Sequence, residues 1–308
     1  MKRIVITGAT SMIGIACIRA CIAEGCEVLA IVREGTSRLG RLPKSEQIRL
    51  AYADLDTLSA VQGDGRPYDV FYHFAWSHTS KTQRDDPAAQ ENNIRTTLQA
   101  VELAHRLGCK TFIGAGSQAE YGIVEERICA DTRPEPVTAY GMAKLSANLL
   151  SRRLCEQYGI RHIWGRIFSV YGTLDNEGTM LNHALEKFQQ GQTACFSAAT
   201  QMWNYLYEED AGRLFYLLGS RQAEPGIYCI AHSESRPLRE YILQLKDLWG
   251  EGARCEFAPA NPDAKMVSLN VDIRKTVEAT GYEPRISFAE GMGRIIRSRR
   301  EAKGAELP

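Results

Sequence analysis

Three residues in the middle of the chain carry side chains that could act together on a carbonyl group. Ser117 directly follows an apolar stretch, residues 111–116, that predicts a strand. Tyr140 and Lys144 lie near the start of a predicted helix and, four residues apart, share one face of it. An ammonium beside a phenol stabilises the phenolate and lowers the pKa of the phenol. The three groups could therefore polarise a ketone and pass it a proton while a hydride arrives at its carbon.

The sequence around these residues indicates the elements that would position them. Thr138 follows a proline-punctuated loop, residues 133–137, and is a candidate N-cap for the helix that carries Tyr140. A Tyr-x-x-x-Lys pair by itself also occurs on many solvated helix faces, so the catalytic interpretation needs support from elsewhere in the chain.

The N-terminal region supplies that support. Residues 1–55 are expected to alternate strand, helix, strand, helix, strand, with the first strand at residues 2–6. A turn containing Gly8, Ser11 and Gly14 joins this strand to the first helix. Such a turn lets backbone N–H groups and the helix N-terminus approach a pyrophosphate. An ordinary strand-to-helix turn is the alternative interpretation.

Together these features resemble the extended short-chain dehydrogenase/reductase family, which includes NAD-dependent epimerases and dehydratases and nucleotide-sugar 4-ketoreductases. In that family the turn reads Gly-x-x-Gly-x-x-Gly. Here Ser11 replaces the middle glycine, and its hydroxyl can still cap the helix. Residues 73–75 (His-Phe-Ala) resemble the family's His-x-Ala, and residues 166–172 (Arg-Ile-Phe-Ser-Val-Tyr-Gly) resemble its Arg-x-x-Asn-x-Tyr-Gly. The resemblance covers nearly the whole chain.

The resemblance implies an α/β fold, a doubly wound parallel-sheet Rossmann fold with a smaller C-terminal α/β substrate lobe. Residues 1–172, joined again by about 204–232, would form the NADP-binding Rossmann domain. Residues 173–203 and 233–308 would form the substrate-binding lobe. The helices at about 93–107 and 140–158 carry apolar faces, and the corresponding helices of the family pair between subunits. The resemblance therefore implies a homodimer, with burial inside one subunit as the alternative.

The resemblance also implies three sets of site residues. The catalytic set is Ser117, Tyr140 and Lys144. The cofactor-binding set is Gly8, Thr10, Ser11, Met12, Ile13, Gly14, Arg33, Asp54, Leu55, Phe74, Ala75, Tyr140, Lys144 and Ile167. The substrate-binding set is Ser77, Gln118, Ser169, Thr179, Asn182 and Trp203.

The end of the second predicted strand bears on the choice of cofactor. A carboxylate there would accept hydrogen bonds from the ribose hydroxyls of NAD and repel a 2′-phosphate. This chain instead has Arg33 at that point, with Arg38 and Arg41 close behind. A guanidinium can stack on adenine and grip a phosphate with two N–H groups. We therefore expect NADP(H) rather than NAD(H); a basic solvated loop is the alternative.

Two positions that differ from the family's pattern narrow the reaction and the substrate. Members that dehydrate nucleotide hexoses carry an Asp-Glu pair after the Ser/Thr, whereas this chain has Gln118 and Ala119, which argues against dehydration. The arginine that contacts the nucleotide diphosphate in many members is replaced by Trp203, which could stack on a sugar or belong to the core. Arg213 or Arg236 could then supply the missing positive charge, or the substrate could be a different one.

Three functional interpretations remain. The first is an NADPH-dependent reductase that delivers hydride to the C4 ketone of a nucleotide-linked 4-keto-6-deoxyhexose, with Tyr140 as general acid, in the synthesis of deoxysugar precursors of surface polysaccharides. The second is an NAD(P)-dependent nucleotide-sugar 4-epimerase, in which Tyr140 first removes a proton and the hydride returns to the other face of the sugar. The third is a non-catalytic regulator that senses NADP, against which the complete Ser-Tyr-Lys set counts.

Composition excludes several other classes. The chain of 308 residues has 37 basic and 37 acidic residues, a balance that argues against nucleic-acid or membrane-surface binding. Its N-terminal apolar run is too short for a signal peptide or a membrane span. Nine cysteines without a C-x-x-C pair predict reduced thiols, a cytoplasmic location and no metal site.

Overall fold

Seven parallel strands form the main sheet, in the order β11-β6-β5-β4-β1-β2-β3. A computed structural model describes residues 1–79, 83–261 and 266–302. The sheet strands are β1 (Arg3–Thr7), β2 (Glu27–Val32), β3 (Ile48–Tyr52), β4 (Val70–His73), β5 (Thr111–Ser117), β6 (Arg161–Ile167) and β11 (Gly226–Ile230). This order is that of a doubly wound Rossmann fold, so the predicted fold class is confirmed.

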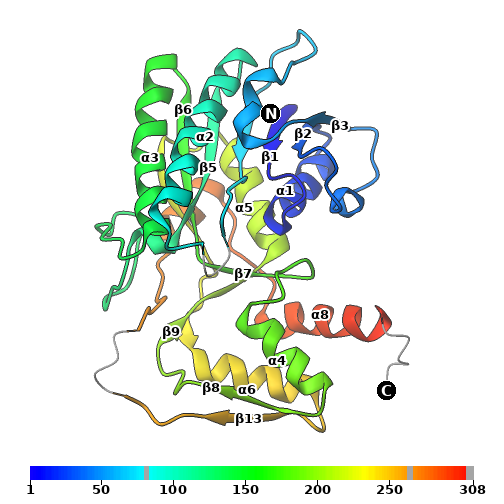
Figure 1. Ribbon diagram of the computed structural model, residues 1–308, viewed down its shortest axis with the longest axis vertical. Helices are drawn as coiled ribbons and strands as arrows, with labels where there is room; N and C mark the ends of the chain where they lie inside the picture. The colour runs from blue at the N-terminus through cyan, green and yellow to red at the C-terminus, as the bar shows by residue number, and fades with distance from the viewer. Residues whose placement is uncertain (80–82, 262–265, 303–308) are drawn as a thin grey trace.

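Helices cover both faces of the sheet (Figure 1). On one face α1 (Met12–Ala23) packs against α5 (Glu208–Ser220), and on the other α2 (Pro87–Arg106) packs against α3 (Ala139–Tyr158). The strands are nearly continuous apolar runs because both of their faces are buried. Successive β1 residues Ile4, Val5 and Ile6 are all 0% exposed, although Ile4 and Ile6 join the α1–α5 core and Val5 joins the α2–α3 core.

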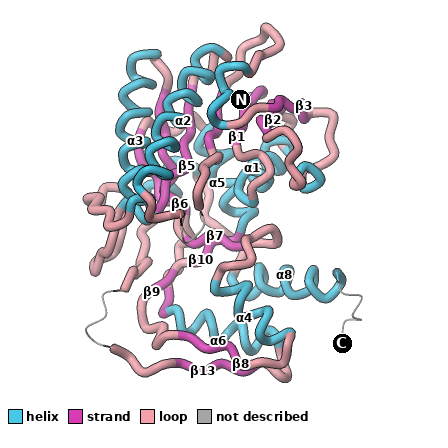
Figure 2. Tube along the Cα trace, viewed as in Figure 1, coloured by secondary structure: helices cyan, strands magenta, loops and turns pink. Residues whose placement is uncertain are grey.

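A smaller part of the chain lies beyond the carboxyl edge of the sheet (Figures 1 and 2). Helices α4 (Met180–Gln189), α6 (Leu238–Trp249) and α8 (Phe288–Ala302) contribute to a separate hydrophobic core there. Its short ladders pair β10 with β7, β12 with β9, and β13 with β8. The elements are β7 (Ser169–Tyr171), α4 (Met180–Gln189), β8 (Thr193–Phe196), β9 (Met202–Trp203), β10 (Tyr205–Tyr207), β12 (Arg236–Pro237), α6 (Leu238–Trp249), β13 (Arg254–Phe257) and α8 (Phe288–Ala302). Helix α7 (Arg274–Thr280) instead packs against α5 and β11 of the Rossmann part. Three 3₁₀ turns complete the fold: η1 (Leu39–Arg41), η2 (Leu55–Ala60) and η3 (Gln118–Glu120).

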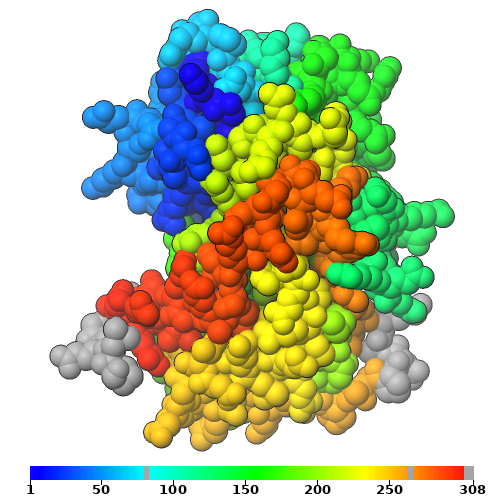
Figure 3. Space-filling view, turned by 180° about the vertical axis from the view of Figure 1, so that it is seen from behind, coloured from blue at the N-terminus to red at the C-terminus, as the bar shows by residue number. Residues whose placement is uncertain are grey.

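Two buried polar side chains fasten the two parts together. The Asn204 amide, which is 0% exposed, donates to the carbonyl oxygens of His232 and Glu234 at 2.8 and 2.9 Å. The Asp210 carboxylate accepts hydrogen bonds from the backbone N–H groups of Arg285 and Ile286 at 3.0 and 2.8 Å. Seen from behind, the C-terminal segment that Asp210 holds crosses the junction between the two parts (Figure 3).

The structure corrects two predicted element boundaries. Helix α2 begins at Pro87, six residues before the predicted start at Asn93, because Asp86 caps its N-terminus and proline is favoured in the first turn. Strand β3 ends at Tyr52, before residues 54–55 where the third strand was expected to end, and Asp54 is instead the N-cap of η2. Within the described residues, no helix combines the length and apolar character needed to cross a membrane.

Candidate active site

The glycine turn lies where the strand order reverses, between β1 and β4. Ligands of open α/β sheets bind at such points, beside the carboxyl ends of the strands. Gly8 has φ +68°, and a Cβ on it would come within 2.7 Å of the Ala75 backbone nitrogen. The Ser11 hydroxyl accepts a hydrogen bond from the backbone N–H of Gly14 at 3.1 Å, so the expected cap of α1 is confirmed. Glycine is therefore required where the turn after β1 approaches the chain after β4.

A cavity of about 610 Å³ opens at this turn. Seven predicted cofactor residues line it, as does Ser77, which was predicted to bind substrate: Gly8, Thr10, Ser11, Arg33, Leu55, Phe74, Ala75 and Ser77. The predicted cofactor residues Met12, Ile13 and Gly14 lie in the first turn of α1 and Ile167 at the end of β6, outside the described lining. The volume of the cavity and the start of α1 beside the turn at Gly8 fit the adenosine and pyrophosphate of a dinucleotide.

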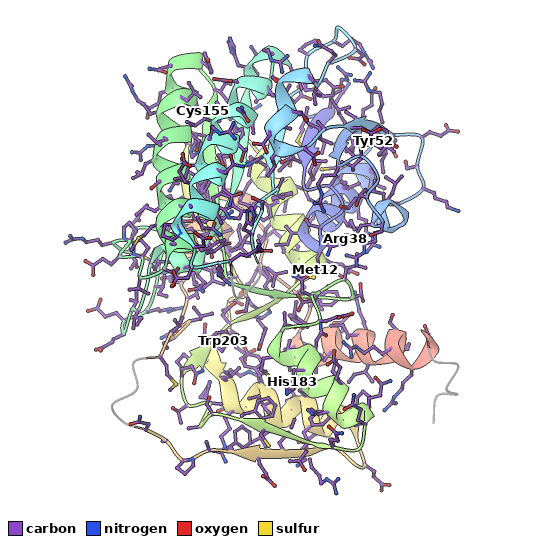
Figure 4. All side chains as sticks on the ribbon, in the orientation of Figure 1. Met12, Arg38, Tyr52, Cys155, His183 and Trp203 are labelled. Carbon is purple, nitrogen blue, oxygen red and sulfur yellow. The ribbon has the colours of Figure 1, made fainter. Side chains whose placement is uncertain are left out.

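A second cavity of about 430 Å³ adjoins the first. Arg33 and Arg38 line both cavities, and Asp54 lines the second. Figure 4 labels Arg38 and Met12 on the same side of the Rossmann part, above the junction. Glu34 also lines the second cavity, so two guanidinium groups and two carboxylates share it. The arrangement offers cations to a phosphate but is not uniformly basic.

The structure brings Ser117, Tyr140 and Lys144 together. Ser117 ends β5, and α3 begins at Ala139, with the Thr138 hydroxyl accepting from the Gly141 N–H at 3.1 Å as predicted. The Lys144 ammonium lies 5.8 Å from the centroid of the Tyr140 ring. Strand β5 and helix α3 thus deliver all three predicted catalytic side chains to one place.

The pKa of Tyr140 differs in direction from the expectation. Burial raises the pKa of the phenol, while the Arg84 positive charge and a hydrogen bond with Ser117 oppose the rise. The Arg84 guanidinium carbon lies 4.2 Å from the centroid of the Tyr140 ring, and the Arg84 carbonyl accepts the Tyr140 backbone N–H at 3.1 Å. The expectation of a phenol with a lowered pKa is therefore wrong, since desolvation outweighs the positive charge of Arg84 and the hydrogen bond with Ser117.

Lys144 is 3% exposed and enclosed by groups that the sequence did not reveal. Its ammonium donates to the Ala115 carbonyl oxygen at 2.7 Å and lies 3.6 Å from the centroid of the Trp76 ring. Burial lowers the pKa of Lys144 to about 7; the Glu120 carboxylate opposes this and Arg84 adds to it. The ammonium is therefore poised between charge states near neutral pH.

Glu120 is a buried carboxylate directly behind Ser117. It is 0% exposed and accepts hydrogen bonds from the Ser117 N–H at 2.8 Å and the Trp164 indole at 2.9 Å. Its other oxygen forms an ion pair with Arg166 at 2.9 Å. Sequence reasoning missed Glu120, although the Ser-x-x-Glu spacing that begins at Ser117 is a capping-box signature and the box is present. Trp76 and Arg84 gave no comparable signal.

The predicted substrate residues lie on several elements. The Ser77 N–H and hydroxyl both contact the Asn93 side-chain oxygen at 2.9 Å. Gln118 begins η3, Ser169 begins β7 and Thr179 precedes α4. Asn182 is buried and accepts from Arg299 at 2.7 Å. Trp203, labelled in Figure 4, is half-buried in β9 on the far side of the junction from Met12.

The two arginines suggested as substitutes for the missing cation have different surroundings. Arg213 lies on α5 and forms an ion pair with Glu24 at 2.6 Å, against the end of α1. Arg236 pairs with Trp203 in the β12–β9 ladder, and its guanidinium carbon lies 4.1 Å from the centroid of the Tyr241 ring. Arg236 is therefore the candidate beside Trp203. In the described ranges, no three His, Cys, Asp or Glu residues are grouped so that they could hold a metal ion.

Comparison with known proteins identifies a matching family model and relatives of similar sequence. Residues 4–231 match the model of the NAD dependent epimerase/dehydratase family. The UDP-glucuronate 4-epimerase of Thermodesulfobacterium geofontis is 23% identical over 264 residues, which cover 84% of this chain and 81% of that protein. UDP-glucuronic acid decarboxylase 1 of Arabidopsis thaliana is 24% identical over 311 residues, which cover 96% of this chain and 69% of that protein.

Solved structures share the whole fold. The UDP-glucose 4-epimerase of Thermotoga maritima with UDP-glucose has a TM-score of 0.83 at 20% identity, covering 98% of this chain and 99% of that chain. The UDP-N-acetylglucosamine 4-epimerase of Methanobrevibacter ruminantium M1 in complex with UDP-N-acetylmuramic acid has a TM-score of 0.84 at 18% identity, covering 98% and 99%. The UDP-glucuronic acid 4-epimerase of Bacillus cereus in complex with NAD has a TM-score of 0.82 at 20% identity, covering 99% of each.

Proposed function

The chain belongs to the NAD dependent epimerase/dehydratase family, a family of enzymes, and from that premise we propose that it transfers hydride at C4 of a nucleotide-linked sugar. The observation that carries the proposal is the convergence of Ser117, Tyr140 and Lys144 beside a cavity that fits a dinucleotide. The direction that this site supports best is reduction of a nucleotide-linked 4-keto-6-deoxyhexose with NADPH.

The chain's own side chains would act at the ketone oxygen. A bound nicotinamide cofactor would supply the hydride. The Ser117 hydroxyl would hold the oxygen by a hydrogen bond, and Tyr140 would donate its proton as negative charge develops there. Burial raises the pKa of Tyr140, so the phenol keeps its proton at neutral pH and is ready as an acid. The positive charge of Lys144 would stabilise the phenolate left behind.

Gln118 and Ala119 support the choice against dehydration. Elimination of water from the sugar needs a further acid and base beside the ketone. An amide and a methyl group occupy the two positions after Ser117, and neither can carry a proton between sugar atoms. Simple hydride and proton transfer is the chemistry that remains for the site.

A 4-epimerase is the second candidate, and the relatives favour it. Solved structures similar to this chain include 4-epimerases of UDP-sugars, and one of them is in complex with NAD. In an epimerase Tyr140 would accept the sugar's hydroxyl proton and later return it. Arg33 and Arg38 at the second cavity favour the reductase instead, because they suit the 2′-phosphate of NADPH, a cofactor consumed as a reagent.

Cofactor stoichiometry separates the two candidates. The protein would be incubated with NADPH and a panel of nucleotide 4-keto-6-deoxyhexoses, and separately with nucleotide hexoses. We expect absorbance of the reduced cofactor to fall mole for mole with product from one of the keto sugars. Many turnovers of a nucleotide hexose without net cofactor oxidation would make the epimerase the correct assignment. If the protein bound NADP but catalysed neither reaction, the non-catalytic NADP-sensing regulator would be favoured.

Cofactor preference is tested at Arg33. Arg33→Ala should weaken NADPH binding by about 1.5–3 kcal/mol, the range for hydrogen bonds to a charged group, and NADH binding hardly at all. Arg41→Ala is the matched control, because Arg41 lies in the same segment but outside the described lining of both cavities. Equal losses for NADPH and NADH, measured by titration calorimetry, would contradict the assignment.

We further propose a homodimer and a cytoplasmic location. The exposed face of α3 carries Met142, Leu149 and Leu150, which are 52%, 45% and 49% exposed. An apolar face of this kind is suited to pairing with the same helix of a second copy.

A further inference from the structure

Trp76 adjoins both the large cavity and the Lys144 ammonium. The indole lines the cavity, whereas Ser117, Tyr140 and Lys144 are absent from the described lining. The same ring lies 3.6 Å from the Lys144 nitrogen and meets the Tyr140 ring edge to face at 6.0 Å between centroids. Trp76 therefore links the cavity lining to the two predicted catalytic side chains of α3.

Buried amides of α2 hold Trp76 in this position. The indole N–H donates to the Gln90 side-chain oxygen at 2.9 Å, and Gln90 is 1% exposed. The Gln90 amide in turn donates to the His78 carbonyl at 2.9 Å, where the backbone adopts φ +56°. Asn93 fixes the intervening Ser77. The loop is thus anchored on both sides of the ring, so the indole is a fixed surface rather than a mobile one.

The Trp76 indole restricts the position of the Lys144 ammonium. A lysine ammonium has three N–H donors, and one of them is committed to the Ala115 carbonyl oxygen. An indole face attracts a cation at this distance but accepts no directed hydrogen bond as strong as a carbonyl's. The lysine is consequently held in place, and among the described residues its ammonium makes one hydrogen bond, to Ala115.

We propose that Trp76 is a positioning residue for Lys144: its indole face holds the ammonium at the inner end of the cofactor cavity, with donors available to the ribose next to the nicotinamide. The proposal rests on the proposed function for the identity of that ribose. It gives a role to the large aromatic side chain that follows Ala75, since Trp76 both lines the cavity and contacts Lys144.

The charge state of Lys144 gives the proposal a signature. The groups that face the ammonium are Glu120 from η3, Arg84 from the loop before α2, Tyr140 on α3 itself, and His73 at the end of β4, whose pKa Lys144 helps to lower. The indole acts in two opposite ways: its π face favours the ammonium, and its bulk excludes water, which disfavours it. A substitution that removes only the π face should therefore lower the pKa of Lys144, whereas one that also admits water should raise it.

The first arm of the test needs no cofactor. Lysine side chains would be labelled with ¹³C, and the Lys144 signal assigned by its loss in Lys144→Met. We expect its methylene resonances to be shifted upfield by the indole ring in the wild-type protein and in Trp76→Phe, and unshifted in Trp76→Leu. On titration, Trp76→Leu should lower the pKa of Lys144, while Trp76→Ala, which admits water, should raise it. An unchanged spectrum in Trp76→Leu would overturn the proposal.

The second arm measures binding of NADPH and of 2′,5′-ADP, which lacks the nicotinamide half. Trp76→Leu should weaken NADPH by about 2- to 30-fold, corresponding to about 0.5–2 kcal/mol for a cation–π contact, and leave 2′,5′-ADP unchanged. Trp76→Phe should recover most of the loss. Trp249→Leu is the control, because Trp249 also faces an arginine, Arg300 at 5.5 Å, but at the end of α6.

The outcomes separate the proposal from the function beneath it. Equal loss of NADPH and 2′,5′-ADP in Trp76→Leu would mean that Trp76 only supports the loop, and would overturn the positioning role. Failure of the wild-type protein to bind NADPH or NADH would overturn the proposed function, while the lysine resonances would still decide whether Trp76 positions Lys144.

Discussion

At the scale of single residues, the site is dominated by desolvation. Burial raises the pKa of Tyr140 and lowers that of Lys144, and both shifts favour the neutral form of the side chain. Two groups oppose the rise in the pKa of Tyr140 without reversing it. They are the Arg84 guanidinium, which lies over the tyrosine ring, and the Ser117 hydroxyl. A neutral, protonated phenol is the form that can donate a proton to a ketone, as the proposed reduction requires.

Removal of the phenol hydroxyl tests this reading. Tyr140→Phe leaves the ring against Trp76 and Arg84, so the fold and the cofactor cavity should persist. General acid catalysis is worth about 10²–10⁴ in rate, and we expect kcat to fall by that order while NADPH affinity changes little. Tyr158→Phe at the other end of α3 is the matched control. A variant that kept more than about a tenth of the activity would exclude Tyr140 as the acid.

At the scale of elements, one carboxylate joins three of them. Glu120 lies in η3, accepts from the last residue of β5, and forms ion pairs and hydrogen bonds with Arg166 and Trp164 of β6. Both charges of the pair are at most 1% exposed. A buried pair contributes little to net stability, but loss of one partner leaves the other charge desolvated. The pair therefore fixes the end of β5, and with it Ser117, more than it stabilises the fold.

A double substitution separates these two roles. Glu120→Gln keeps an oxygen for the Ser117 N–H but leaves the Arg166 charge unpaired, and should lower the free energy of unfolding by about 3–5 kcal/mol. Glu120→Gln combined with Arg166→Met removes both charges and should recover most of that loss. Urea unfolding of the two variants measures the difference. If Glu120→Gln alone lowered the free energy of unfolding no more than the double substitution, the Arg166 charge would have gained another partner or become solvated.

The elements differ in how far the sequence could predict them. The β1 turn, the cap at Ser11 and helix α3 follow from local rules, so their positions were predictable. The start of α2 was not, because the Asp86–Pro87 signal lies before the apolar pattern on which the prediction rested. Glu120 could have been found from its spacing to Ser117. Trp76 and Arg84 reach the site through tertiary packing alone, which no spacing in the sequence encodes.

At the scale of the whole molecule, two neutral histidines inside the Rossmann part link stability to pH. His73 is hydrogen-bonded to Thr7 at 2.8 Å, and His162 to Ser151 at 2.9 Å. Burial lowers the pKa of each from 6.5 to about 3. Each imidazole is therefore neutral in the folded protein over a pH range in which it would be protonated in the unfolded chain.

The sign of the effect follows from proton binding. Between pH about 6.5 and 3 the unfolded chain binds more protons at these two sites than the folded protein, so stability falls as pH falls through that window. Above pH 6.5 both states are neutral and the contribution is constant. Each histidine can contribute up to about 1.4 kcal/mol per pH unit inside the window.

A substitution at His162 tests this linkage. His162→Phe keeps a ring between Phe112 and Trp164, and Ser151 retains its hydrogen bond to the Asn148 carbonyl at 3.2 Å. Relative to the wild-type protein, the variant should gain about 3 kcal/mol in free energy of unfolding between pH 7 and pH 4, whatever its stability at pH 7. Phe112→Leu disturbs the same stack without removing a titrating group, so its stability curve should run parallel to the wild-type curve. Parallel curves for His162→Phe as well, from urea unfolding at each pH, would mean that His162 takes up its proton without unfolding the protein.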